Sequence, residues 1–185
     1  MDHRNALIVV DVQLGFEDPS WGRGNNPSCV ANILRLLQAW RQHGQPVVVV
    51  RHDSQSSASP LRPGQPGNDL APGVDGPRDL LVAKTVNSAF YGTPDLDDWL
   101  RATGTAHVTV CGITTNHCCE TTARMAGNLG YATAFVLDAT RTFDRVGPDG
   151  QVVPAEDLSR VTAANLHGEF ATVVNTAAAI DSLDT

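Results

Sequence analysis

The sequence predicts a three-layer α/β/α domain, in which a six-stranded, mostly parallel sheet carries helices on both faces. Short apolar runs rich in β-branched residues recur along the chain and are typical of strands that are buried on both faces. Segments with apolar residues at helical spacing alternate with these runs, which is the pattern of βαβ units. No internal repeat or low-complexity linker divides residues 1–185, so we expect a single domain.

Six apolar runs are expected to form the strands. The first, at residues 6–10, reads Ala-Leu-Ile-Val-Val and ends at Asp11. The other five lie at residues 47–50, 80–83, 106–111, 133–137 and 170–174. Numbered along the chain, the strands are expected in the order 3-2-1-4-5-6.

Helices are expected between the strands, at residues 30–43, 94–102, 118–129, 154–166 and 176–180, with a turn at 147–150. Gly44 and Gly130 are helix stop signals. Thr93 is expected to cap the second helix and Pro94 to occupy its first position. Residues 54–77 are rich in Ser, Pro and Gly, and a loop of this length in a compact domain is usually functional.

Composition and charge exclude several classes of function. The formal net charge of −7 and the lack of a basic run argue against a nucleic-acid partner. The longest apolar segments have the length of a strand, so we expect no membrane contact, and the N-terminus lacks the apolar core of a signal peptide. We therefore expect a cytoplasmic protein whose four cysteines are thiols. No pair of them has the C-x-x-C spacing of a structural zinc site.

Three residues that suit covalent catalysis are expected at one edge of the sheet. Asp11, Lys84 and Cys118 each follow or end an apolar run, and the carboxyl ends of parallel strands meet at one edge. Lys84 is the single lysine among 13 basic residues, the other 12 being arginines. Cys118 lies where a strand passes into a helix, a position that favours a thiolate.

These residue types form a plausible nucleophilic unit. Lys84 would lower the pKa of the thiol of Cys118, and Asp11 could accept the thiol proton and return it to the leaving group. Backbone N–H groups in the turn before Cys118 could stabilise a tetrahedral oxyanion. A strand-end Asp as a turn former, a solvated Lys and a core Cys are the ordinary alternatives for each residue taken singly.

The chain resembles the isochorismatase-like cysteine hydrolases, which include nicotinamidases, N-carbamoylsarcosine amidases and streptothricin hydrolase. The resemblance covers essentially the whole chain and implies a Rossmann-like sheet. Its motifs are the segment 7–13 with Phe16; Ala83 and Lys84 with Ser88, Ala89, Phe90 and Thr93; the segment 112–118 with Thr122, Ala123 and Arg124; and Asp138 with Ala139.

The resemblance implies a role for each site residue. Asp11 would be the general base and acid, Lys84 its charged partner and Cys118 the nucleophile. A cis peptide bond between Ile113 and Thr114 would direct the N–H groups of Thr114 and Cys118 to the oxyanion. Members with this cysteine generally act on C–N bonds, so we expect a small amide substrate, and members often form homodimers or homotetramers.

No metal or other cofactor is expected. Nicotinamidases of the family hold a divalent metal with an Asp-x-His pair and a further His after the second strand. This chain has Arg51-His52-Asp53-Ser54 there, and no histidine follows until His107. The segment looks more like the metal-free, streptothricin-hydrolase-like branch.

Further residues are candidates for substrate contact. The aromatic residues Phe16, Trp21, Phe90 and Tyr91 flank the motif loops and could wall a pocket, with core or lid packing as the alternative. Arg51, His52 and Asp53 are polar residues at a strand end, and they could meet a polar substrate group or form a loop salt bridge. His117 is expected to line the site.

Cys119 stands where the family usually has valine, and we expect it to pack as a valine-sized core residue. The function we expect is hydrolysis of a small amide or lactam through a thioester on Cys118. Two alternatives remain open: hydrolysis of an ester or vinyl ether, and a non-catalytic redox or binding role in which Cys118 and Cys119 respond to oxidant.

Overall fold

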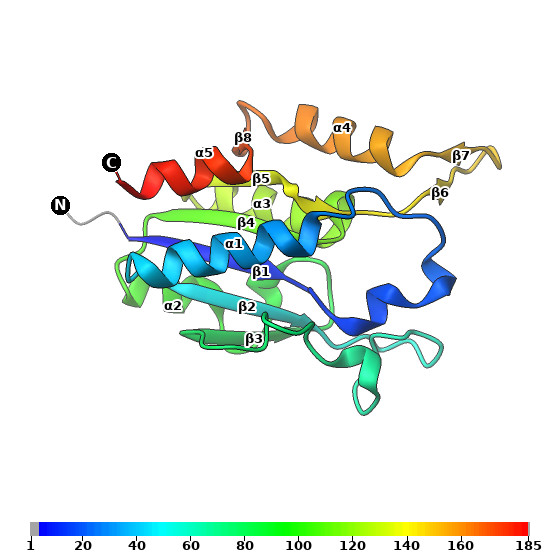
Figure 1. The fold of residues 1–185 in the computed structure, drawn as a ribbon, viewed down its shortest axis with the longest axis horizontal. Helices are drawn as coiled ribbons and strands as arrows, with labels where there is room; N and C mark the ends of the chain where they lie inside the picture. Colours follow the sequence, from blue (N-terminus) through cyan, green and yellow to red (C-terminus); the bar gives the residue numbers. More distant parts are fainter. Residues whose placement is uncertain (1–3, 185) are drawn as a thin grey trace.

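The computed structural model describes residues 4–184. Its main sheet has six parallel strands in the order β3-β2-β1-β4-β5-β8, which is the predicted order (Figure 1). The strands are β1 (Asn5–Val10), β2 (Val47–His52), β3 (Leu80–Lys84), β4 (His107–Ile113), β5 (Ala132–Arg141) and β8 (Thr172–Val174). The parallel α/β fold expected from the sequence is confirmed.

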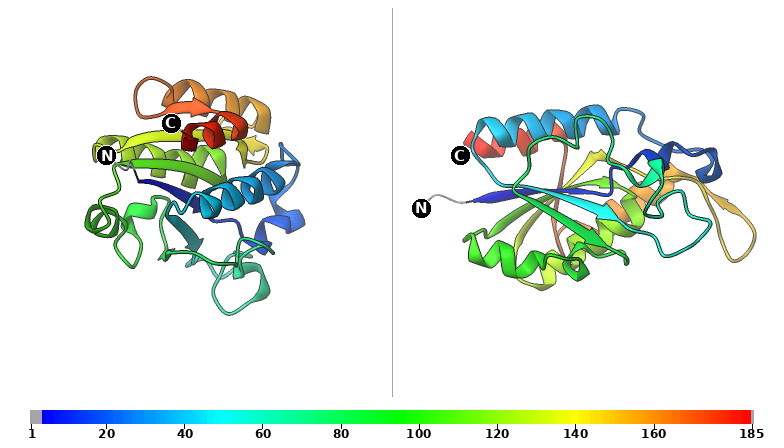
Figure 2. Two further views of the ribbon diagram at one scale, coloured as in Figure 1. Left: turned by 60° about the vertical axis from the view of Figure 1, so that its left-hand side comes forward. Right: turned by 90° about the horizontal axis from the view of Figure 1, so that it is seen from below.

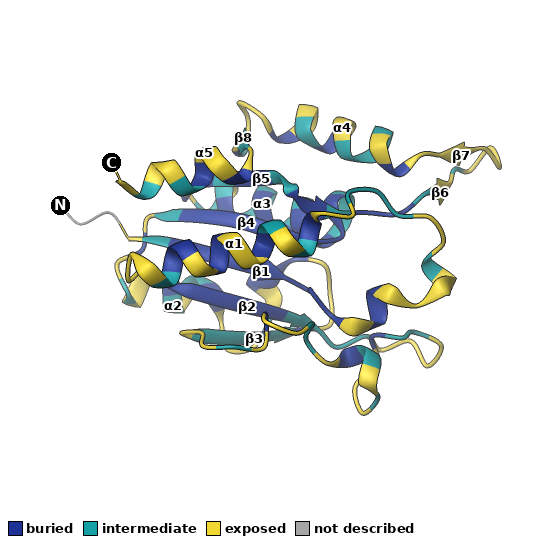
Figure 3. Ribbon diagram, viewed as in Figure 1, coloured by how far each residue is buried: buried dark blue, intermediate teal, exposed yellow. Residues whose placement is uncertain are grey.

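The central strands are apolar on both faces because both faces are covered. Leu7 and Val9 of β1 pack in one core cluster, and Ile8 and Val10 pack in the other. Figure 3 shows these strands as the most buried part of the molecule. This double burial explains the continuous apolar run in the sequence.

Helices form the two outer layers. On one face lie α1 (Cys29–Gln42) and α5 (Thr176–Asp181), and on the other lie α2 (Leu96–Ala102), α3 (Glu120–Asn128) and α4 (Ala155–Leu166) (Figure 2). Single-turn helices occur at Leu14–Glu17, Pro19–Trp21, Pro66–Asn68, Ala89–Tyr91 and Ser182–Asp184. No helix within residues 4–184 is long and apolar enough to cross a membrane.

A small hairpin projects beyond the carboxyl edge of the sheet (Figure 1). It pairs β6 (Arg145–Val146) with β7 (Val152–Val153) in antiparallel register, around the turn predicted at 147–150. The sequence predicts the turn but not the strands, because two-residue strands carry no measurable periodicity.

Two predicted helix starts are wrong. Thr93 does not cap α2: its backbone pairs with Ala83, its peptide bond to Pro94 is cis, and Asp95 caps the helix by accepting the N–H of Asp98. Cys118 does not begin α3, because a π-helical turn at Thr115–Cys119 precedes that helix. The last strand is also shorter than expected, starting at Thr172.

Candidate active site

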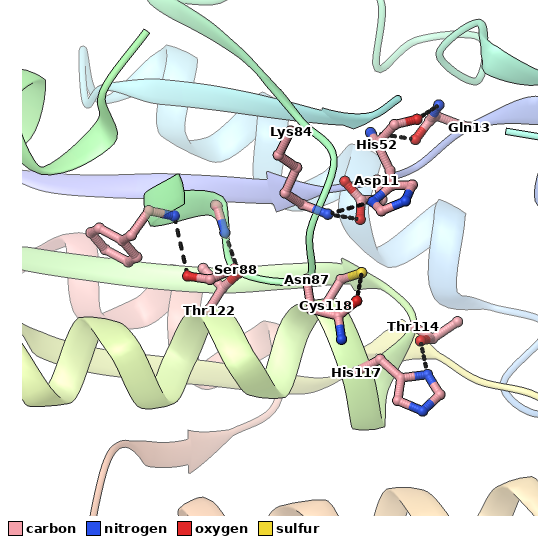
Figure 4. Close-up of polar contacts among 12 residues, drawn as sticks. Asp11, Gln13, His52, Lys84, Asn87, Ser88, Thr114, His117, Cys118 and Thr122 are labelled. Carbon is pink, nitrogen blue, oxygen red and sulfur yellow. Dashed lines mark hydrogen bonds and ion pairs between the residues drawn. The ribbon is translucent and has the colours of Figure 1, made fainter. Parts of the chain in front are cut away.

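Ionisable side chains meet at the carboxyl ends of the strands (Figure 4). Asp11 follows β1, and His52 and Lys84 are the last residues of β2 and β3, where their positions are paired in the parallel register. Cys118 reaches the same place from the turn after β4. A carboxylate oxygen of Asp11, a ring nitrogen of His52 and the sulfur of Cys118 lie within 4.8 Å of one another. The structure thus brings together the three residues singled out in the sequence.

Asp11 and Lys84 form a buried ion pair. The Lys84 Nζ lies 2.5 Å from Oδ2 of Asp11, and neither side chain has exposed surface. Burial raises the pKa of Asp11, against the opposing effect of the Lys84 charge. Burial lowers the pKa of Lys84, but the negative charge of Asp11 and the hydrogen bond to it act in the opposite direction, and the pKa of Lys84 is raised. Lys84 is therefore an ammonium group, and Asp11 binds a proton more readily than an exposed carboxylate does.

His52 is a third member of this cluster. Its Nδ1 lies 3.1 Å from Nζ of Lys84. Because an ammonium group only donates, Nδ1 must accept, which leaves the ring proton on Nε2. Gln13 fixes the His52 backbone on both sides: its Oε1 accepts the His52 N–H at 2.8 Å, and its Nε2 donates to the His52 carbonyl at 3.1 Å.

This arrangement predicts the pH dependence of activity. Burial and then the charge of Lys84 lower the pKa of His52 below 6.5, so the neutral ring persists through neutral pH. We expect kcat/KM to be level at and above about pH 7 and to fall only at lower pH, as His52 and Asp11 bind protons. In His52→Gln the amide oxygen can still accept from Lys84 without titrating, so the acid limb should move to lower pH. A wild-type acid limb centred above pH 7 would contradict this assignment.

In the turn that carries Cys118, the backbone N–H groups of the two flanking residues bond to one carbonyl. The carbonyl of Thr114 accepts the N–H groups of His117 at 3.3 Å and Cys119 at 3.1 Å, the residues on either side of Cys118. The Ile113–Thr114 peptide bond is cis, as the resemblance implies. The sulfur of Cys118 lies 3.8 Å from Oδ1 of Asn87, to which its S–H donates.

Glycine is required just before this turn. Gly112 has φ +132°, and a Cβ atom there would lie 2.0 Å from the carbonyl oxygen of Val10. Any side chain would therefore push the end of β4 away from β1. Close approach of these two strands holds the Cys118 turn beside Asp11.

The pKa of Cys118 moves in the direction opposite to the sequence prediction. Burial and then the negative charge of Asp11 raise it, and the positive charge of Lys84 compensates only in part. Position near the start of a helix was expected to favour the thiolate, but Cys118 is 8 % exposed and desolvation dominates. The resting residue is a thiol, and its deprotonation needs a base.

A cavity of about 190 Å³ opens over these groups. Of the predicted substrate contacts, Phe16, Trp21, His52 and His117 line it. Three lining residues were not among the predicted contacts: Leu61, Asn87 and Arg145. Leu61, Asn87 and Arg145 lie in loops or in a short hairpin that no pattern predicts.

Four predicted contacts do not line the cavity: Arg51, Asp53, Phe90 and Tyr91. Arg51 forms a salt bridge with Asp53 at 2.8 Å, which is the alternative considered for it. Phe90 is buried and packs against Tyr131, with ring centroids 6.0 Å apart. Tyr91 is 70 % exposed. These residues miss the cavity because of the direction in which their side chains point, and that direction depends on the local register of each segment.

The other cysteines are buried in the core. Cys29, Cys111 and Cys119 are at most 1 % exposed, and burial raises the pKa of each. All four cysteines are free thiols. Cys119 belongs to the same apolar cluster as Ala123 and Phe135, which fits the packing role expected from the sequence.

The donor set of Asp11, His52 and Cys118 does not suit a metal ion, although its atoms are close enough. The ammonium group of Lys84 bonds both Asp11 and His52. A divalent cation among these ligands would lie next to that positive charge. Lys84 thus already provides the positive charge in this position.

Comparison with known proteins agrees with the geometry. A model of the Isochorismatase domain matches residues 5–177. The chain belongs to the isochorismatase family. Streptothricin hydrolase from Streptomyces noursei is 34 % identical over 177 residues, which is 94 % of this chain and 69 % of that protein. Nicotinamidase 3 from Arabidopsis thaliana is 31 % identical, over 92 % of this chain and 84 % of that protein.

A solved structure of a relative shows the same fold. The cysteine hydrolase from Pseudomonas syringae pv. phaseolicola 1448A superposes with a TM-score of 0.86 at 29 % identity, covering 98 % of this chain and 92 % of that one. The protein is an isochorismatase-like cysteine hydrolase by fold and family.

Proposed function

We propose that this member of the isochorismatase family hydrolyses a C–N bond of a small amide or lactam through a thioester on Cys118. One observation carries the proposal: the thiol of Cys118 faces a buried Asp11–Lys84 ion pair at the wall of a small cavity. The elements needed for nucleophilic catalysis, a thiol with a base in reach and a fixed positive charge, occur together there.

In the first step, a proton moves from the Cys118 sulfur to Asp11. The second carboxylate oxygen, Oδ1, is buried and accepts no hydrogen bond from residues 4–184, so it is available for that proton. Before transfer the charges are one carboxylate and one ammonium; afterwards they are one thiolate and one ammonium. Because the net charge of the buried cluster is unchanged, the transfer avoids the cost of creating an uncompensated buried charge.

The thiolate then attacks the substrate carbonyl carbon and forms a C–S bond. We propose that the N–H groups of Thr114 and Cys118 stabilise the oxyanion, supported by the bonding of the neighbouring N–H groups of His117 and Cys119 to the Thr114 carbonyl. Asp11 donates its proton to the nitrogen as the C–N bond breaks. In the second half, Asp11 takes a proton from water, the water oxygen attacks the thioester, and Cys118 leaves and regains its proton.

The relatives and the cavity support a small amide as substrate. One relative is named a nicotinamidase, and a structural relative is named a cysteine hydrolase. A cavity of about 190 Å³ suits a small molecule. The steps above use protein groups and water alone.

We also propose a cytoplasmic location, which fits the four free thiols. We propose a homodimer or homotetramer as well, which fits the exposed side chains of Val146 and Val152 on the hairpin.

Matched pairs of amides and esters that share one acyl group test this function. The thioester and its hydrolysis are common to both substrates, so a difference in kcat/KM reports the acylation step, and hydrolysis of the small primary amide above background is the expected result. Cys119→Val serves as the control, because it changes the adjacent buried thiol and should keep full activity. Ester or vinyl-ether hydrolysis without any amide hydrolysis would replace this proposal with the alternative chemistry.

A further inference from the structure

We propose that Arg145 selects substrates that carry a carboxylate near the scissile amide, by binding that carboxylate at the mouth of the catalytic cavity. The inference rests on the proposed amide hydrolysis and names its substrate class. Arg145 is the first residue of β6 and lines the cavity that also contains Asp11, His117 and Cys118.

Arg145 stands where two cavities share walls. A second cavity of about 410 Å³ adjoins the first, and both are lined by Trp21, Thr114, His117 and Arg145. A substrate with its carbonyl at Cys118 can therefore extend past Arg145 toward this wider space. The position suits recognition of the part of the substrate that does not react.

The charge of Arg145 has no ion-pair partner among residues 4–184. Its guanidinium forms no hydrogen bond or ion pair with any residue in 4–184. The carboxylates on this side of the cavity are already engaged: Asp144 accepts bonds from Arg23 at 3.1 Å and from the N–H of Ala155 at 2.8 Å, and Glu120, whose charge acts on His117, pairs with Arg124 at 2.8 Å. Five N–H donors in a planar fork thus remain available to a ligand.

The other charged groups at the cavity do not attract an anion. Asp11 is negative and is neutralised by Lys84. His52 is neutral, and burial together with the positive charge of Arg145 lowers the pKa of His117, which keeps that ring neutral as well. Phe16, Trp21 and Leu61 are apolar. Arg145 is the cation among these lining residues that is free to bind an anionic ligand.

A carboxylate is the anion that this geometry favours. A guanidinium binds carboxylate in a bidentate manner, and the chain's net charge of −7 repels anions at long range, so a local cation is needed to retain one. The inferred substrate is a small amide with a carboxylate a few bonds from the carbonyl.

Alkylation of Cys118 tests the anion site without requiring turnover. Iodoacetate and iodoacetamide form the same C–S bond and differ in charge, so the ratio of their rates at Cys118, read by peptide mass spectrometry, reports attraction of a carboxylate. We expect Arg145→Met to lower this ratio about tenfold and Arg145→Lys to lower it less. Arg35→Met removes the same charge from the exposed face of α1 and should leave the ratio unchanged.

Turnover supplies the second readout. For succinamate against butanamide, which differ by a carboxylate in place of a methyl group, Arg145→Met should raise KM for succinamate about tenfold more than it raises KM for butanamide. An unchanged alkylation ratio, or an equal loss on both amides, would overturn the inference. A lowered ratio in a protein that hydrolyses no amide would keep the anion site and refute the proposed function instead.

Discussion

Replacing Cys118 by alanine is expected to reduce kcat for amide hydrolysis by at least about 10⁴-fold, the scale on which loss of a nucleophile acts in enzymes of this kind. The thiol forms the covalent bond to the substrate, and no other group at the cavity can take its place. The substitution removes one sulfur atom from a site that is 8 % exposed, so the fold should persist. Steady-state kinetics and circular dichroism of the purified variant measure both effects.

The neighbouring thiol provides the matched comparison for that result. Cys119 is fully buried, and Cys119→Val keeps a similar volume in an apolar cluster. We expect this variant to retain wild-type kcat. If Cys119→Val lost activity while Cys118→Ala kept it, Cys118 would not be the nucleophile.

Breaking the Asp11–Lys84 pair is expected to lower the free energy of unfolding by about 3–5 kcal/mol, because each single substitution leaves the partner charge buried and uncompensated. The test uses Lys84→Met and Asp11→Asn. Asparagine suits the backbone at this position, where φ is +53°, since Asn tolerates left-handed conformations. Urea unfolding of each variant gives the free energies.

The double variant separates stability from catalysis. Asp11→Asn combined with Lys84→Met removes both charges, so its loss of stability should be smaller than the sum of the two single losses. Its activity should be as low as that of either single variant. Arg160→Met, which breaks an exposed pair with Asp157 on α4, should cost less than about 1 kcal/mol. Strict additivity of the two buried substitutions would contradict the ion pair.

The sequence predicts the fold and the convergence of three site residues for the same reason. Buried parallel strands are apolar on both faces, as in β1, and this gives a strong local pattern. Their carboxyl ends lie at one edge, so Asp11 and Lys84 must approach one another once both strands are recognised.

The rest of the site depends on register and loop geometry that local patterns do not contain. His52 contacts Lys84 because the two are paired positions of β2 and β3. In a strand, neighbouring side chains point to opposite faces, so Arg51 points away from the site when His52 points into it. Arg145 reaches the cavity on a two-residue strand.

The pKa of Cys118 shows where a local rule is outweighed. A cysteine near the start of a helix is expected to have a lowered pKa. In the folded protein, burial and the negative charge of Asp11 act more strongly than the helix and Lys84, so the thiol form prevails. The same burial raises the pKa of Asp11 and makes it a better acceptor of the thiol proton.

A covalent adduct on Cys118 during turnover tests the central claim most directly. The enzyme is mixed with a hydrolysed amide, quenched in acid within the first turnovers, digested and analysed by mass spectrometry. We predict that the peptide containing Cys118 gains the mass of the acyl group and loses it on treatment with neutral hydroxylamine, as a thioester does. Turnover with no acyl group on that peptide and no hydroxamate product in the presence of hydroxylamine, or an acyl group on another residue, would contradict the account.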